Sequence, residues 1–144
     1  MDRIEVIAEE ISRLVPKLIK GMRRGVASDF QLTPSQMTVL LEVFDRKASR
    51  VGELSNSMRV SAPTVSGLID RLVRSGHLRR SHDKKDRRAV NVELTGKGRK
   101  TVENLIFEIK AKWHMILTHL TEEERENYLR ILKRIDEVLN SNNA

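Results

Sequence analysis

Residues 61–98 read SAPTVSGLIDRLVRSGHLRRSHDKKDRRAVNVELTGKG, and this stretch decides the fold. Its first part predicts a helix with Ser61 as the N-cap and Pro63 in the first turn. Apolar residues recur at helical spacing over Val65–Val73, so one face of this helix is expected to be buried. Gly76 then provides the residue type that most often follows a helix end.

The second part of this stretch predicts a β-hairpin. Leu78–Ser81 has the pattern of an extended segment, and Val90–Leu94 alternates apolar and polar residues as a half-buried strand does. The residues between them, 82–89, read HDKKDRRA and are too polar to be buried. We therefore expect two strands joined by a charged tip, which is the wing of a winged helix.

Upstream of Ser61, the sequence predicts a helix-turn-helix. A short helix over roughly Val51–Met58 is joined to the next helix by a turn of three residues, Met58–Val60. A further helix begins after Thr33, with a proline at its first position and Gln36 completing a capping box. Its expected buried face consists of Met37, Leu40, Leu41 and Phe44.

Long amphipathic helices are predicted at both ends of the chain. The first opens with a capping box of Asp2 and Glu5 and contains Pro16, which is expected to bend it. A helix capped by Thr95 and a last helix with a capping box at Thr121–Glu124 follow the hairpin. Their wide apolar faces have no core of their own, so a second copy of the chain is the expected cover. An intramolecular helical subdomain is the alternative.

The predicted fold is therefore mainly α-helical with a small β-hairpin wing. We expect one domain over residues 1–144, in which residues 33–98 form the winged helix-turn-helix lobe. Residues 1–30 and 99–144 are the predicted dimerisation helices.

The positive charge of the chain is concentrated in its middle. The sequence has 27 Lys and Arg, 20 Asp and Glu, and a net charge of +7. Between Arg46 and Lys100 there are 15 basic and 5 acidic residues, a net of +10, so the flanks together are slightly acidic. This distribution favours double-stranded DNA as partner over an ordinary solvated charge run.

Several other classes of function are not supported. The chain has no cysteine, and the spacing of its histidines (His77, His82, His114 and His119) does not suit a helical metal site, so we interpret them as surface or hinge residues. No catalytic constellation, metal site or cofactor motif is found, and an enzyme is not expected. The acidic N-terminus does not resemble a signal peptide, and no apolar run is long enough to cross a membrane, so a cytoplasmic protein is expected.

Candidate DNA-binding residues lie on the polar face of the helix after Ser61 and on the wing. Small and hydroxylated residues let a helix backbone approach a major groove, and arginines can bind guanine or phosphate. The candidates on the helix are Ser61, Ala62, Pro63, Thr64, Ser66, Arg71 and Arg74. The candidates on the wing, which is narrow enough for a minor groove, are Lys84, Lys85, Arg87 and Arg88. An ordinary surface helix and a solubilising loop are the alternatives.

Two segments resemble a known family. Residues 86–98, DRRAVNVELTGKG, resemble the wing-to-helix signature of the MarR (multiple antibiotic resistance regulator) family. Residues 68–78, LIDRLVRSGHL, are similar to the end of that family's recognition helix and the turn after it. The resemblance extends over essentially the whole chain. It implies a triangular dimer in which the terminal helices of two chains interlock and each chain presents one winged lobe to DNA.

The resemblance also implies roles for particular residues. Arg88 stands at the position of the family's wing arginine, with Asp70 as its implied carboxylate partner, and Asp86 is assigned with them to bracing the wing. Arg87, nearer the tip, is then the candidate for insertion into the minor groove. Family members often release DNA when small aromatic anions bind, so a small-molecule effector is an expectation.

The sequence thus predicts a homodimeric repressor that binds a pseudo-palindromic operator in double-stranded DNA. Two alternatives stay open at this stage. One is an architectural protein that binds DNA without sequence preference. The other is a domain that uses its basic surface to bind an anionic small molecule.

Overall fold

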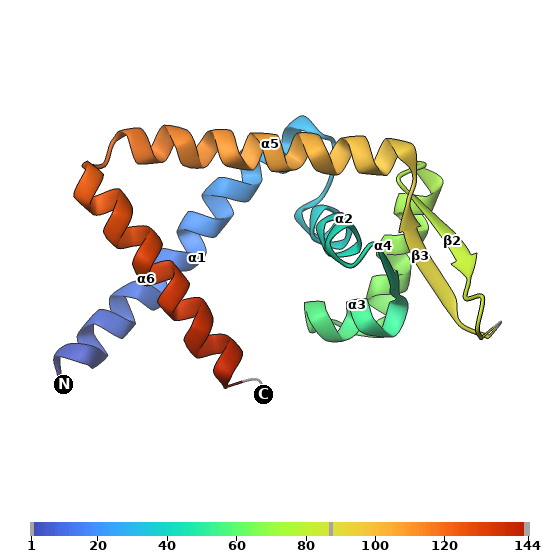
Figure 1. Cartoon of the computed structure of the whole chain (residues 1–144), viewed down its shortest axis with the longest axis horizontal. Helices are drawn as coiled ribbons and strands as arrows, with labels where there is room; N and C mark the ends of the chain where they lie inside the picture. The colour runs from blue at the N-terminus through green and yellow to red at the C-terminus, as the bar shows by residue number, and fades with distance from the viewer. Residues whose placement is uncertain (1, 87, 143–144) are drawn as a thin grey trace. The chain divides into compact units, whose positions relative to one another are not determined.

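A computed structural model describes residues 2–86 and 88–142, without the side chains of residues 27, 28 and 48. The chain divides into two compact units, Met1–Glu108 and Ile109–Ala144, and helix α5 runs across the boundary. Figure 1 labels the helices and strands in chain order. They are α1 (Arg3–Asp29), α2 (Pro34–Arg46), β1 (Ala48–Arg50), α3 (Val51–Met58), α4 (Ala62–Arg74), β2 (Leu78–His82), β3 (Val90–Leu94), α5 (Gly96–Thr118) and α6 (Glu122–Ser141).

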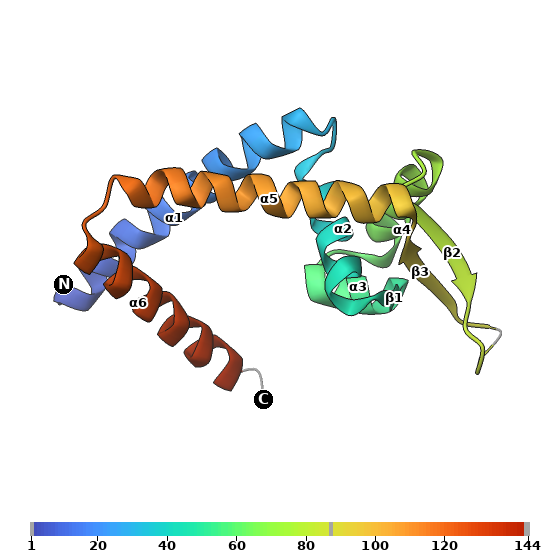
Figure 2. The ribbon, with the colours of Figure 1, turned by 45° about the horizontal axis from the view of Figure 1, so that its top comes forward.

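The first unit contains a lobe in which α2, α3 and α4 pack together beside a small antiparallel sheet. The β2–β3 hairpin projects from this lobe in both views (Figures 1 and 2). Fully buried aliphatic side chains from every helix of the lobe, from the sheet and from the start of α5 form the core. They are Val39, Leu40, Val43, Leu54, Val65, Ile69, Leu72, Leu78, Val92, Val102 and Leu105. The predicted winged helix-turn-helix is confirmed.

Helix α2 begins as the sequence predicts. The backbone N–H of Gln36 donates to Thr33 Oγ1 over 3.1 Å, and the backbone N–H of Thr33 donates to Gln36 Oε1 over 2.9 Å. Its buried face differs in part from the expected one. Met37 and Leu40 are buried, but the other fully buried positions are Val39 and Val43, whereas Leu41 and Phe44 are half-buried. This face is wide because α2 packs against α3, α4 and the sheet at once.

The sheet has a third strand that the sequence did not reveal. Strand β1 pairs with β3 on the side opposite β2, so the strand order is β1-β3-β2. Strand β1 has only three residues, too few to show an alternating pattern. Lys47, directly before it, adopts a positive φ of 65°, which turns the chain out of α2 and into the strand.

Helix α1 is a single helix from Arg3 to Asp29, and Pro16 does not end it. Its capping box is present, because the backbone N–H groups of Asp2 and Glu5 each donate to the carboxylate of the other residue. The helix exposes a series of large aliphatic side chains. They are Ile4, Ile7, Ile11, Leu14, Val15, Leu18 and Ile19.

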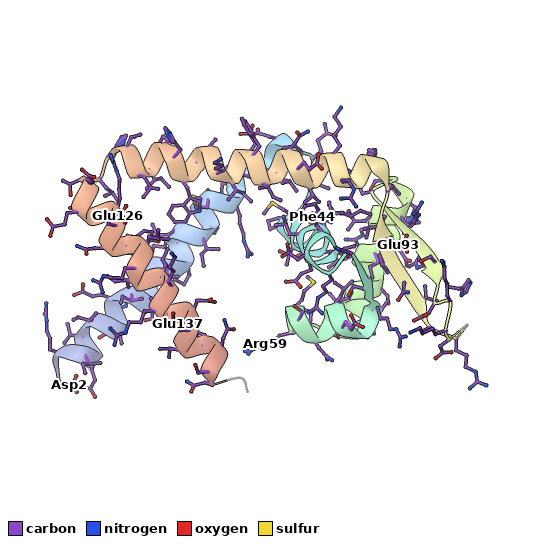
Figure 3. All side chains as sticks on the ribbon, in the orientation of Figure 1. Asp2, Phe44, Arg59, Glu93, Glu126 and Glu137 are labelled. Atoms are coloured by element: carbon purple, nitrogen blue, oxygen red, sulfur yellow. The ribbon has the colours of Figure 1, made fainter. Side chains whose placement is uncertain are left out.

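The second unit consists of the later part of α5 and of α6. Thr121 and Glu124 form the predicted capping box at the start of α6. The rings of Trp113 and Tyr128 lie 5.9 Å apart, and Arg125 Nε donates to the carbonyl of Leu117, so the turn between the helices is fixed from both sides. Helix α6, which carries the labels Glu126 and Glu137 in Figure 3, has no buried residue. Its exposed apolar residues include Leu129, Leu132, Ile135, Val138 and Leu139.

Over residues 2–86 and 88–142, no helix combines the length and the apolar character needed to cross a membrane.

Candidate nucleic-acid interface

The turn between α3 and α4 is fixed by backbone geometry. Arg59, labelled in Figure 3, adopts the left-handed conformation with φ 54° and ψ 42° and ends α3. The Val60 N–H donates to the carbonyl of Ser55 over 3.2 Å, and the Ser55 hydroxyl donates back to the carbonyl of Val60. These bonds hold α4 at a defined angle to α3, as a helix-turn-helix requires.

The N-terminus of α4 is exposed and rich in hydroxyl groups. Ser61 Oγ accepts the backbone N–H of Thr64 over 3.3 Å and lies 2.7 Å from Thr64 Oγ1, so the predicted cap is present. All seven candidate residues of this helix lie on or beside its exposed face. Exposed are Ser61, Ala62, Pro63, Thr64, Arg71 and Arg74, and Ser66 is half-buried. The opposite face, with Val65 and Ile69, is fully buried.

Two aspartates organise the loop at the tip of the hairpin. Asp83 Oδ1 accepts the backbone N–H of Lys85 over 2.9 Å, and Asp86 Oδ1 accepts the backbone N–H of Arg88 over 3.0 Å. The Asp83 N–H donates to the carbonyl of Ala89 over 3.1 Å and closes the loop. Such side-chain-to-backbone bonds are typical of Asx turns. Asp86 thus orders the wing through the backbone.

The loop presents its cations to solvent. Lys84, Lys85 and Arg88 are exposed, and their side chains have no hydrogen-bond or ion-pair partner among the described residues. Arg87, the candidate for minor-groove insertion, lies outside the described residues. Asp83 and Asp86 bond to backbone N–H groups of the loop rather than to these cationic side chains, so the loop has a defined shape without neutralising them.

Asp70 has a different partner from the one implied by the family resemblance. Its carboxylate pairs with the guanidinium of Arg80 on β2, and not with Arg88. Arg80 lies on β2, which packs against α4, whereas Arg88 follows the loop turn that Asp86 closes. The hairpin is therefore tied to α4 from the middle of β2.

Two further ion pairs fix the hairpin. Glu93, labelled in Figure 3, lies opposite Arg79 in the β2–β3 register, accepts both Nε and Nη2 of Arg79 and also accepts the hydroxyl of Ser81. Arg50 Nη2 donates to Asp83 Oδ2 over 2.7 Å. Sequence reasoning did not single out Arg50 or Glu93, because each partner depends on strand register. The sequence offered only two hints of these pairs, namely that Arg50 is a cation directly before α3 and that Glu93 is a carboxylate on the strand with alternating residues.

Helix α4, the hairpin and α5 meet at His77. The His77 N–H donates to the carbonyl of Leu72, and the His77 carbonyl accepts the N–H of Thr95. Gly76, directly before His77, adopts a φ of 81°. Thr95 Oγ1 donates to the carbonyl of Gly76 and accepts the N–H of Gly98, which confirms Thr95 as the cap of α5. A Cβ atom at Gly98 would lie 2.0 Å from the His77 carbonyl oxygen, so the two backbones are in direct contact.

The side chain of His77 is buried, which corrects the interpretation of this residue as a surface or hinge histidine. Its Nδ1 lies 2.7 Å from Ser75 Oγ. Burial, followed by the positive charge of Lys97, lowers the pKa of His77 below its usual value. Lys97 itself donates to the carbonyl of Ser75 over 2.7 Å. The other three histidines are exposed.

No group of three or more His, Asp or Glu side chains within the described part of the chain could hold a metal ion. The described surface of α4 and the wing presents hydroxyl groups, exposed cations and the N–H groups of a helix N-terminus, which suit the phosphates and base edges of a nucleic acid.

Comparison with known proteins identifies this arrangement. The model of the MarR family matches residues 32–90. The HTH-type transcriptional repressor MdtR of Bacillus subtilis is 31% identical over 113 residues, which cover 78% of this chain and 69% of that protein. The HTH-type transcriptional repressor YetL of the same organism is 28% identical over 103 residues, which cover 70% of this chain and 62% of that protein.

The fold agrees with these matches. A MarR family protein from Bacillus stearothermophilus superimposes with a TM-score of 0.87 at 26% identity, covering 97% of this chain and 99% of that one. The match includes the terminal helices as well as the winged lobe. The chain therefore belongs to the MarR family of helix-turn-helix transcriptional regulators.

Proposed function

We propose that this protein is a homodimeric repressor that binds a pseudo-palindromic operator in double-stranded DNA. One observation carries the proposal. The exposed, hydroxyl-rich N-terminus of α4 lies in one lobe with a hairpin whose tip presents Lys84, Lys85 and Arg88 without side-chain partners among the residues described. A protein acting on chromosomal DNA in this way is expected in the cytoplasm.

In this proposal α4 enters the major groove with Thr64 and Ser66 toward the bases. Arg71 and Arg74, in the last turns of the helix, bind guanine or phosphate. The wing follows the neighbouring minor groove, whose negative potential attracts Lys84, Lys85, Arg87 and Arg88. The Ser61 hydroxyl is already used to cap α4, so its contribution to DNA binding is the exposed helix N-terminus.

The second copy of the chain covers the apolar faces of α1 and α6. These faces expose Ile11, Leu18, Leu132 and Ile135, among others, far more apolar surface than scattered surface residues usually leave in water. A two-fold dimer would place its two α4 helices roughly 34–36 Å apart, which is one turn of DNA. Sedimentation at low micromolar concentration should give twice the chain mass, and a monomer that binds DNA as a single lobe would contradict the dimer.

Selection of bound sequences from a random DNA pool tests the function directly. An inverted repeat should emerge, and its affinity should fall steeply with salt, with a log–log slope on the order of −5 or steeper for a dimer. Enrichment of no sequence would instead favour an architectural DNA-binding protein. A slope near −1 would mean that the basic surface does not contact the phosphates.

The proposal includes a small-molecule effector. A hollow of about 640 Å³ lies between α1 and the start of α2, within the first unit. It combines apolar and cationic side chains, which fits a small aromatic carboxylate. The lining residues are Pro16, Ile19, Lys20, Arg23, Arg24, Leu32 and Pro34.

Release of DNA by a panel of small aromatic carboxylates tests this part of the proposal. The variant Arg23→Gln should lose the response while it keeps DNA affinity. Arg13→Gln, a change to an exposed arginine on the same helix that pairs with Glu9, should keep the response. A response that is unchanged in Arg23→Gln would place the effector elsewhere.

A further inference from the structure

Arg50 and Asp83 join the wing to the helix-turn-helix across 33 residues of sequence. Arg50 is the last residue of β1 and also the N-cap position of α3, the first helix of the helix-turn-helix. Asp83 is the first residue after β2, where the hairpin loop begins. Their ion pair, with 2.7 Å between Nη2 and Oδ2, therefore connects two parts of the proposed DNA-binding surface.

The Arg50–Asp83 pair links two parts of the chain that strand pairing does not join, namely β1 and the loop after β2. Arg50 lies opposite Asn91 on β3, and Asn91 lies opposite Ser81 on β2. Strand β1 does not pair with β2, and the Arg50 side chain links β1 directly to the wing loop. Asp83 lies two residues beyond Ser81, on the same face of the hairpin, because side chains alternate along a strand.

The Asp83 carboxylate uses its two oxygens for different purposes. Oδ1 accepts the backbone N–H of Lys85 and shapes the loop, whereas Oδ2 accepts from Arg50 and fixes the loop to the rest of the lobe. The hydrogen bond from Lys85, followed by that from Arg50, lowers the pKa of Asp83. The same pair raises the pKa of Arg50. Both groups thus stay charged at neutral pH.

We propose that Arg50 and Asp83 are positioning residues that hold the wing at the angle at which its cations reach the minor groove. This inference rests on the proposed DNA-binding function. It has an unusual consequence, because Asp83 is an anion on a surface that faces phosphate. On charge alone its removal should strengthen DNA binding, whereas its role in holding the wing requires that its removal weaken binding.

The variant Asp83→Asn separates these effects. Its amide oxygen can still accept the Lys85 N–H, so the loop keeps its turn, but its amide nitrogen cannot accept from Arg50. We expect about two- to five-fold weaker binding to the selected site, the scale of one exposed ion pair. Hydroxyl-radical footprinting should also show loss of protection in the minor groove where the wing lies. Asp45→Asn removes one negative charge from an exposed position on α2 of the same lobe without touching the Arg50–Asp83 pair or the hairpin, and should leave that protection intact.

A double-mutant cycle completes the test. Arg50→Ala should weaken binding to the selected DNA site. The double variant Arg50→Ala/Asp83→Asn should bind this site no more weakly than whichever single variant has the lower affinity. If Arg50 only contacts phosphate, Arg50→Ala weakens binding while Asp83→Asn leaves it unchanged or strengthens it, and the inference is overturned. Additive losses would overturn it as well.

The wild-type protein is measured first on the same DNA. Absence of binding by the wild type would remove the proposed function and this inference together, whereas wild-type binding with an unaffected Asp83→Asn variant would remove the inference alone. Both side chains are partly exposed, and circular dichroism melting of each variant verifies that the fold is kept.

Discussion

The carboxylate of Asp70 on α4 pairs with the guanidinium of Arg80 on β2, ten residues further along the chain. The recognition helix and the wing are therefore linked at the middle of the hairpin, before its loop begins. The pair neutralises one of the two adjacent arginines of β2, and Glu93 pairs with the other. Among the described residues, the hairpin cations without a side-chain partner, Lys84, Lys85 and Arg88, all lie in the loop.

This link predicts a difference between Arg80 and Arg88. A double-mutant cycle on the free energy of unfolding should give a coupling of about 0.2–1 kcal/mol between Asp70→Ala and Arg80→Ala, the range for exposed ion pairs. The same cycle between Asp70→Ala and Arg88→Ala should be additive. Urea denaturation of the wild type, the three single variants and the two double variants measures both couplings. Coupling of Asp70 to Arg88 but not to Arg80 would restore the partner implied by the family resemblance.

Arg88→Ala should instead act on DNA binding. Because its side chain is exposed and unpaired among the described residues, its removal should change the free energy of unfolding by less than about 0.5 kcal/mol. Loss of one phosphate contact should reduce the salt slope by about one unit. Titrations at several salt concentrations measure this slope, and an unchanged slope would mean that Arg88 does not reach phosphate.

The proposed base-reading residues make a third prediction. Thr64→Ala, Ser66→Ala and Arg71→Ala should each cost about 1–3 kcal/mol on the selected operator and much less on random DNA. Thr64→Ala also removes a hydroxyl that lies 2.7 Å from the Ser61 cap, so its melting temperature serves as the control for folding. Equal losses on both DNAs for all three variants would place sequence recognition elsewhere.

The contact between Gly98 and His77 makes a prediction about stability. Gly98→Ala would force a Cβ atom against a backbone oxygen, and should destabilise the lobe by about 1–3 kcal/mol or more. Gly96→Ala is the matched control, because a Cβ there meets no atom within 4 Å. It should be neutral or stabilising by up to about 1 kcal/mol, since alanine favours helix. Equal unfolding free energies for the two variants would contradict the close approach.

His77 should make stability depend on pH. Its pKa is lower in the folded protein, so the unfolded chain binds the proton first as the pH falls. The contribution of His77 to the free energy of unfolding is therefore fully present above the unfolded-state pKa of about 6.5. It is lost as the pH falls from there toward the folded-state pKa. The difference in unfolding free energy between wild type and His77→Gln should shrink over this range. His82→Gln, at the exposed end of β2, serves as the control.

The parts of the fold that depend on local sequence were predictable. Thr33 with Gln36 and Thr121 with Glu124 satisfy their own helix ends within three residues, and both capping boxes are present. The helical spacing from Val65 to Leu72 also sufficed to predict the buried face of α4. Each of these features is settled within one or two helical turns, where pattern and propensity act together.

The pairing of charges was not predictable, because it depends on register. Arg79 and Arg80 are adjacent and identical in type, yet one faces Glu93 and the other faces Asp70, since successive strand residues point to opposite faces. Arg50 gave no signal at all, because its partner is 33 residues away and its strand has three residues. The burial of His77 likewise arises where α4, the hairpin and α5 pack together. A pattern within one short stretch of sequence cannot predict such a contact between three elements.

The joint at His77 has a consequence for how a regulatory signal could travel. Backbone hydrogen bonds connect His77 to Leu72 on one side and to Thr95 on the other, and Gly98 leaves no free space against its carbonyl. The end of α4 and the first turn of α5 are therefore expected to move together, because a packed backbone contact cannot be compressed gradually. A displacement of that first turn should then also displace the end of the recognition helix.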